Sequence, residues 1–175
     1  FYSAIFSIAL ASSTMFLRVF FLSSIFNHQI LPLLFTPLAI LAIIGYISSY
    51  SLKEKISREK PRVVLSSPLD FKVALRFVLL FMLSMFLMNF LKEFFSEKVI
   101  YPIAFLTGLI EMDAITISIS TLALSSIPAG MACKAIILAS LANTLSKWLL
   151  AYWLGSREMA SWLGKIFLAL LLFLI

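Results

Sequence analysis

The sequence has few of the residues on which most enzyme and metal sites depend. Of its 175 residues only 13% are charged, one is a cysteine (Cys133) and one is a histidine (His28). The single cysteine excludes an internal disulfide and a cysteine-rich metal site. No H-E-x-x-H, G-x-S-x-G or glycine-rich phosphate motif occurs in the sequence. We therefore expect a protein that is not an enzyme, with no catalytic residues and no cofactor other than a bound inorganic ion.

Apolar residues are abundant instead, at 62% of the chain with a mean hydropathy of +1.08. A soluble domain is about half apolar and about a quarter charged, so the composition predicts an all-α integral membrane protein. A membrane-spanning helix needs about 20 mostly apolar residues. By that rule the chain is one polytopic membrane domain over residues 1–175 with six transmembrane helices. These are expected at residues 2–25, 31–50, 69–90, 102–124, 129–154 and 159–175.

Half of the net charge of +6 lies in one segment, KEKISREKPR, which begins at Lys53 and ends at Arg62 and has five bases and two acids. A basic cluster beside a membrane span marks a cytoplasmic loop and attracts anionic lipid head groups. We therefore expect loop 51–68 to be cytoplasmic, in the inner membrane of a prokaryote, and we do not expect nucleic acid as a partner. With six spans, the turn at 125–128 and both chain ends would lie on the same side as this loop.

One internal similarity suggests a repeat. Thr14 is followed eight residues later by LSSI, and so is Thr116. This would align spans one to three with spans four to six, and three spans per half would make the repeat inverted in the membrane. Four matching residues between apolar helices also arise by chance.

The most unusual stretch is residues 102–124, PIAFLTGLIEMDAITISISTLAL, which is long enough to span a bilayer yet contains Glu111 and Asp113. At ~1.5 Å per residue the two acids lie roughly 14–17 Å from its start, close to the middle of the membrane. Ionisable groups at that depth are costly and face protein, water or an ion. Asp113 shares a helix face with Thr116 and Ser120. A helix that is polar on several sides is either central or broken near Gly108, which would expose its carbonyls to a cavity.

Other polar residues occur at similar depths in two further spans. The first span has a polar stripe that includes Thr14 and Arg18, and the fifth has one that includes Asn143 and Lys147. We predict that these groups line an ion path, and that Glu111, Asp113 and Asn143 hold a metal ion. Oxygen ligands of this kind suit hard cations such as Mg²⁺. The full set predicted for the path is Thr14, Arg18, Glu111, Asp113, Thr116, Ser120, Asn143 and Lys147.

Three alternatives remain open for this polar set. The acids and bases can form buried salt bridges that only fix packing. Arg18 and Lys147 can line a path for an anion. Two acids can share a proton for hydrolysis, although residues two apart on a helix point to different sides.

Three segments, ASSTMFLRV (11–19), GLIEMDAITISIS (108–120) and LANTLSK (141–147), together resemble the C-terminal membrane domain of unknown function of MgtC/SapB-like proteins. The D-A-I-T and A-N-T-x-x-K elements are the most specific parts of this resemblance. The position of Glu111 is usually aspartate in that family, and the change lengthens the acidic arm by one methylene. The resemblance implies a link to magnesium through the family name alone.

These observations together predict a homodimeric channel or secondary transporter for a small inorganic ion. A cation, including a divalent one, is favoured. The rival prediction is a membrane scaffold or regulatory subunit that does not transport.

Overall fold

The structure is a computed structural model that describes residues 2–50, 99–154 and 157–172, with separate helical positions between 75 and 90. The predicted loop 51–68 and most of the predicted span 69–90 lie outside the described residues. All regular structure in the described part is helical, which confirms the all-α prediction there. The helices are α1 (Tyr2–Phe26), the short 3₁₀ helix η1 (His28–Ile30), α2 (Leu31–Tyr50), α5 (Ile100–Ile110), α6 (Met112–Leu122), α7 (Ala129–Leu154) and α8 (Arg157–Leu172).

Three of these helices, α1, α2 and α7, are long and apolar enough to cross a membrane. They confirm the helices predicted at 2–25, 31–50 and 129–154 to within a residue. The last helix, α8, has 16 residues, which is shorter than the ~20 that a perpendicular span requires. A count of six spans therefore stays a prediction.

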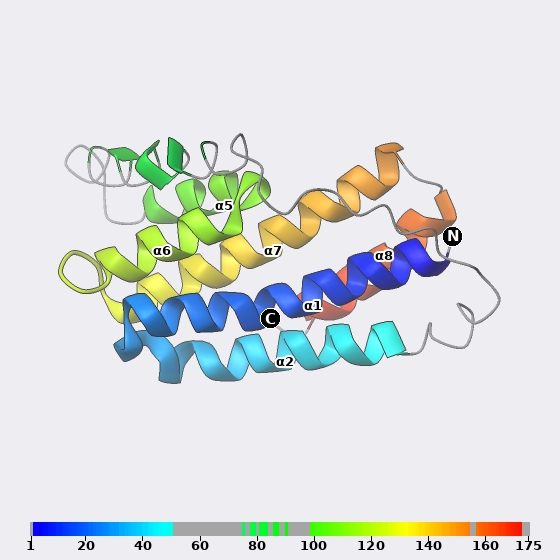
Figure 1. Ribbon diagram of the computed structural model, residues 1–175, viewed down its shortest axis with the longest axis horizontal. Helices are drawn as coiled ribbons and strands as arrows, with labels where there is room; N and C mark the ends of the chain where they lie inside the picture. The colour runs from blue at the N-terminus through cyan, green and yellow to red at the C-terminus, as the bar shows by residue number, and fades with distance from the viewer. Residues whose placement is uncertain are drawn as a thin grey trace.

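α1 and α2 form a helical pair around the turn at Asn27 (Figure 1). Asn27 begins η1, and its side-chain oxygen accepts a hydrogen bond from the backbone N–H of Gln29 at 3.0 Å. The two helices come close where Gly45 faces Ser13, because a Cβ at Gly45 would stand 2.2 Å from the Ser13 hydroxyl oxygen. We call this end of the bundle the Asn27 end and the other, where Tyr50 ends α2, the Tyr50 end.

The single helix predicted at 102–124 is wrong, and the alternative of a broken helix is confirmed. α5 ends at Ile110 and α6 begins at Met112, and between them Glu111 has extended backbone angles (φ −148°, ψ 115°). The break falls at Glu111 rather than near Gly108. Each arm has 11 residues and is therefore about 16 Å long, about half the ~30 Å thickness of a bilayer core.

The two arms run in opposite directions and form a hairpin (Figure 1). Its tip is Glu111, the residue between α5 and α6. α5 runs alongside α7 in the same direction, since Tyr101 and Lys134 line one groove near the starts of the two helices and Gly108 contacts Ala139 further along. α6 then runs back, and a turn at 123–128 joins it to the start of α7. Both open ends of the hairpin therefore lie at the Asn27 end.

This arrangement overturns the predicted position of the turn at 125–128. Two hydrogen bonds tie the neighbourhood of that turn to the Asn27 end: Asn27 Nδ2 donates to the Ser120 carbonyl at 3.2 Å, and the Cys133 thiol donates to the Leu33 carbonyl at 3.4 Å. The chain begins at the opposite end, where Ile5 packs with Ala151. The turn at 125–128 thus lies at the Asn27 end and the start of the chain at the Tyr50 end. They are separated because the hairpin returns to the Asn27 end, whereas a single helix over 102–124 would have reached the other end.

The predicted inverted repeat is not confirmed by the structure. Arg18 of α1 contacts Asp113 of α6, and nine residues further along α1 Asn27 contacts Ser120. The two helices that carry the similar Thr…LSSI segments therefore lie side by side and run in the same direction. An inverted pair would run in opposite directions.

The Cys133 contact follows from a proline in α2. Pro37 lies inside this helix and has no N–H, so it cannot bond the carbonyl four residues earlier, that of Leu33. The buried Cys133 thiol of α7 supplies a donor to this carbonyl. The proline thus creates a polar contact that joins α2 to α7.

Candidate functional site

The candidate site is built on the broken backbone at the hairpin tip. Where a helix ends, its last carbonyls and first N–H groups lose their partners within the helix. At the tip the Asn143 amide of α7 donates to the Gly108 carbonyl at 3.1 Å, and the Glu111 carboxylate accepts the Asp113 N–H at 3.2 Å. Carboxylates at a helix N-terminus are also favoured by the helix dipole. The break is therefore stabilised by two side chains that the sequence analysis assigned to the ion path.

Gly108 lets α5 approach α7 closely just before the tip. A Cβ at this position would stand 2.6 Å from the Ala139 carbonyl oxygen and 2.7 Å from its Cα. Both are backbone atoms, so no side-chain rotation could relieve the clash. Small residues at such crossings allow the close backbone packing that holds helices together in membranes. The contact of Gly108 with Ala139 thus determines the position along α7 at which the tip of the hairpin lies.

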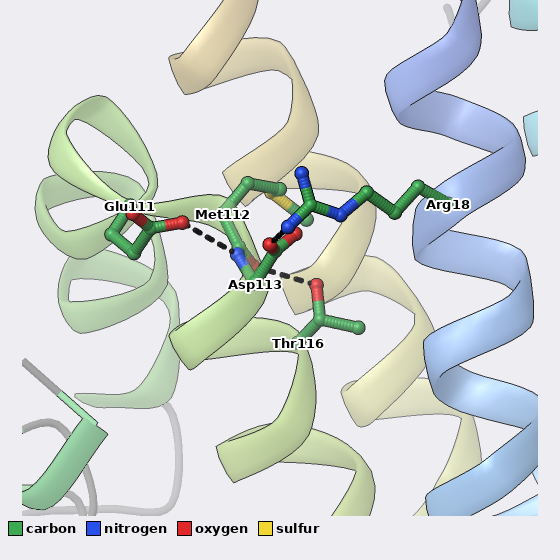
Figure 2. A network of polar contacts seen from close by, with 5 residues as sticks. All are labelled: Arg18, Glu111, Met112, Asp113 and Thr116. Carbon is green, nitrogen blue, oxygen red and sulfur yellow. Dashed lines mark hydrogen bonds and ion pairs between the residues drawn. The ribbon is translucent and has the colours of Figure 1, made fainter. Parts of the chain in front are cut away.

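An ion pair joins the tip to α1. Arg18 contacts the Asp113 carboxylate, as Figure 2 shows, from the side of the hairpin opposite Glu111. The Asp113 side chain is 10% exposed, whereas that of Arg18 is 66% exposed. Asp113 is thus enclosed and compensated, while Arg18 lies on the surface of a helix of membrane-spanning length.

The hydroxyl residues predicted for the path fall in two places. Thr116 and Ser120 are fully buried on the α6 face that meets α1, and the Thr116 hydroxyl donates to the Met112 carbonyl at 2.8 Å (Figure 2). Thr14 is exposed on α1, where its hydroxyl donates to the Leu10 carbonyl and lies 3.3 Å from the Tyr46 hydroxyl of α2. Its contacts therefore join α1 to α2 rather than to the tip.

Lys147 lies one helical turn beyond Asn143 on α7, next to a cavity of about 20 Å³. Its ammonium nitrogen is 3.5 Å from the Ser12 hydroxyl and 3.6 Å from the Met15 sulfur. Ser13, Gly45 and Thr144 also line this cavity, which has room for one water molecule. A larger, mostly apolar groove of about 550 Å³ lies between α2, α5 and α7, and none of the predicted path residues lines it.

The predicted metal ligands lie around the tip, each already engaged in a contact. Asn143 donates to Gly108, Glu111 accepts from the α6 backbone, and Asp113 is paired with Arg18. Among the described residues no three His, Cys, Asp or Glu side chains gather into a metal-binding group. A metal site of two acids and one amide stays a prediction.

One residue at the open end of the hairpin was not among the predicted site residues. Asn27 falls between the helices predicted at 2–25 and 31–50, yet it is 2% exposed and its amide donates to the Ser120 carbonyl. That carbonyl is free because the Leu124 N–H bonds Thr121 instead, in the tighter turn that ends α6. An asparagine directly after an apolar helix indicates a local turn, but it gives no signal of the contact with Ser120.

Comparisons with known proteins agree with part of the resemblance seen in the sequence. A family described as "Domain of unknown function (DUF4010)" matches residues 2–155. An uncharacterized protein of Aquifex aeolicus (strain VF5) is 31% identical over 158 residues, which cover 88% of this chain and 69% of that protein. No solved structure matches significantly. Neither match names an MgtC/SapB-like protein, so that part of the resemblance stays a prediction. The chain belongs to the DUF4010 family of domains of unknown function.

Proposed function

We propose that this protein is a membrane channel or secondary transporter for a small inorganic ion, with the hairpin tip as its central site. A cation is favoured, including a divalent one. The observation that carries the proposal is the backbone break at Glu111, halfway along what would otherwise be a membrane-spanning helix. Many transporters bind their ions at discontinuous helices near the middle of the membrane.

The charges at the tip support a cation. Among the described residues at the tip, Glu111 and Asp113 contribute two negative charges and Arg18 one positive charge, so these residues carry a single net negative charge. Asp113 already has Arg18 as its counter-ion, whereas the Glu111 carboxylate accepts a backbone N–H. In a medium of low dielectric constant a carboxylate without a cationic partner attracts a counter-ion strongly. Glu111 is therefore the group that we assign to binding the transported ion.

Asn143 and Asp113 would then have supporting roles. Asn143 holds the last turn of α5 through the Gly108 carbonyl, and Asp113 holds the first turn of α6 through Arg18. Each arm is thus anchored to a different long helix, α7 or α1. A shift between α1 and α7 would open or close the tip, as a gate requires.

The exposure of Arg18 supports the predicted homodimer. A guanidinium that is 66% exposed on a helix of membrane-spanning length must be covered by protein or reached by water. A second copy packed against α1 would provide that cover. We also retain as proposals the inner-membrane location, the cytoplasmic loop 51–68 that contacts anionic lipids, and the MgtC/SapB link.

The proposal is tested by ion flux in liposomes that contain the purified protein. Glu111→Gln removes the charge and keeps the shape, so we expect flux to fall to the level of empty liposomes. Glu158→Gln is the matched control, because Glu158 is exposed in the first turn of α8. Flux that is unchanged in Glu111→Gln would exclude this acid from the mechanism.

The ion pair itself favours the second candidate function, a scaffold or regulatory subunit. If Arg18 and Asp113 only fix packing, the wild type should move no ion that is tested. A partner membrane protein should then co-purify, and Asp113→Asn should lower the melting temperature without any transport to lose. The liposome measurement on the wild type therefore separates the two functions.

A further inference from the structure

A polar face follows α6 from the tip to the Asn27 end and meets α1 along its length. Asp113, Thr116 and Ser120 follow one another at steps of three and four residues, so they share one side of α6. Contacts at both ends of this row go to α1: Asp113 to Arg18, and the Ser120 carbonyl to Asn27. On α1, Ser23 lies one turn before Asn27 and is also fully buried. We call this set, Ser23 and Asn27 with Asp113, Thr116 and Ser120, the α1–α6 seam.

Two hydroxyls in the seam have no hydrogen-bond partner in the part of the chain that the structure describes. Ser23 Oγ and Ser120 Oγ are fully buried and unpaired, whereas nearby hydroxyls such as that of Thr116 donate to the carbonyl four residues earlier. Leaving a buried hydroxyl unpaired costs about 1–3 kcal/mol. Because buried polar groups in proteins are almost always bonded to protein or to ordered water, each of these two hydroxyls requires a partner.

The chemistry of a hydroxyl indicates which partner. A hydroxyl has one hydrogen to donate as well as lone pairs to offer. A metal cation can take the lone pairs but leaves the hydrogen unbonded, whereas a water molecule can accept that hydrogen and donate in return. Water therefore satisfies both serines, and a chain of hydrogen-bonded waters carries protons.

We infer that the α1–α6 seam holds a file of water molecules that gives protons access from the Asn27 end to the Asp113 carboxylate. At the outer end His28 and Gln29 are exposed. At the inner end, among the described residues, Arg18 of α1 contacts the Asp113 carboxylate and Glu111 at the tip accepts the Asp113 backbone N–H. Lys147 of α7 contacts α1 at Ser12 and Met15. A proton that reaches Asp113 neutralises the carboxylate and removes the attraction that holds Arg18. This inference rests on the proposed function and deepens it by naming the proton as the coupling ion.

Thiol reactivity tests the water file independently of transport. Cys133 is the only cysteine in the sequence, so Cys133→Ser gives a cysteine-free background that keeps a donor for the Leu33 carbonyl. In that background Ser23→Cys and Ser120→Cys are compared with Val19→Cys and Ile119→Cys, which replace equally buried apolar neighbours. The purified proteins are treated with silver ions, and the thiols left free are counted with a fluorescent maleimide after unfolding. Because only a hydrated thiol ionises readily, we expect the two seam thiols to react at least about tenfold faster than the controls. Equal rates would overturn the inference.

Proton flux provides the second arm. In liposomes with an internal pH-sensitive dye, we expect Ser23→Ala with Ser120→Ala to slow proton movement about tenfold. Ser24→Ala with Thr121→Ala is the matched control, since both of those hydroxyls already donate to backbone carbonyls. If the wild type moves cations and the seam variant moves protons as fast as the control, the inference is wrong while the proposed function stands. If the wild type moves no ion, the proposed function fails, and the thiol rates alone decide whether the seam is hydrated.

Discussion

The hairpin tip and the cavity beside Lys147 are two polar regions about one helical turn apart along α7, and their polarity has different origins. At the tip the backbone itself is interrupted, and Asn143 and Glu111 bond the groups that the break sets free. Around the cavity the helices are continuous, and the hydroxyls of Ser12, Ser13 and Thr144 donate to carbonyls of their own helices.

This difference has a direct energetic meaning. Side chains around the cavity can become apolar without leaving any backbone group unpaired, because the helices there satisfy their own backbone. At the tip every polar side chain that is removed leaves a carbonyl, an N–H or a charge without its partner. Substitutions at the tip should therefore cost more than matched substitutions at the cavity.

The largest contrast should come from Arg18→Gln, which leaves Asp113 enclosed without a counter-ion. Removing one partner of a buried pair costs ~3–5 kcal/mol in soluble proteins, and the exposure of Arg18 places our expectation at about 3 kcal/mol. The measurement is unfolding by heat or by a denaturing detergent in micelles. The double variant Arg18→Gln with Asp113→Asn should recover most of the loss. A single variant as stable as the wild type would mean that water already compensates Asp113.

Two glycines give the next contrast. Gly108→Ala at the tip would drive a Cβ into backbone atoms of Ala139, whereas Gly45→Ala at the cavity would meet the hydroxyl of Ser13, which can rotate away. We expect Gly108→Ala to cost about 2 kcal/mol, within the range for overpacked cores, and Gly45→Ala to cost clearly less. Melting temperatures measured side by side check the order of the two. The reverse order would show that α5 and α7 can move apart freely.

A smaller loss is expected from Asn143→Leu, which leaves the Gly108 carbonyl without its donor. An unpaired buried carbonyl costs about 1–3 kcal/mol, and the partial exposure of Asn143 places the loss near the lower limit. Asn27→Leu removes the equivalent bond at the open end of the hairpin, where the side chain is 2% exposed, and should cost more. Comparing the two variants by thermal unfolding shows which end of the hairpin is held more firmly.

The smallest effect should come from Lys147→Met at the cavity. The Lys147 ammonium contacts a hydroxyl and a thioether rather than an acid in the described part of the chain, so its removal leaves no buried charge unpaired. Replacing a buried ionic group with an apolar one of similar size is often neutral or stabilising, and we expect a change within about 1 kcal/mol. Lys134→Met, at an exposed position of the same helix, is the control. A loss as large as that of Arg18→Gln would show that Lys147 compensates an acid.

The long helices were predictable because span length is set by bilayer thickness, and each of them is mostly apolar over about that length. Hydropathy depends on the number of apolar residues and does not detect a reversal of chain direction. The two 11-residue arms, α5 and α6, were therefore predicted as one span. The polar residues on several sides of 102–124 did signal a break, but they did not fix it at Glu111. The pairing of Arg18 with Asp113 was among the pairs expected from their charge and depth.

The capping roles of Asn143 and Asn27 could not be deduced from the sequence. Each binds a carbonyl that is free only because of a local backbone departure, at Glu111 or at the end of α6. Such departures depend on tertiary packing, here on the contact of Gly108 with Ala139. Sequence spacing places residues on helix faces, but it does not show which carbonyl will lack its partner.

Because the hairpin enters and leaves at one end of the bundle, it adds no net crossing to the chain. A version of the protein shortened by both arms would still begin α7 at the Asn27 end of the bundle. Evolution could alter, lengthen or replace the segment that carries Glu111 without reversing the direction of the helices that follow it.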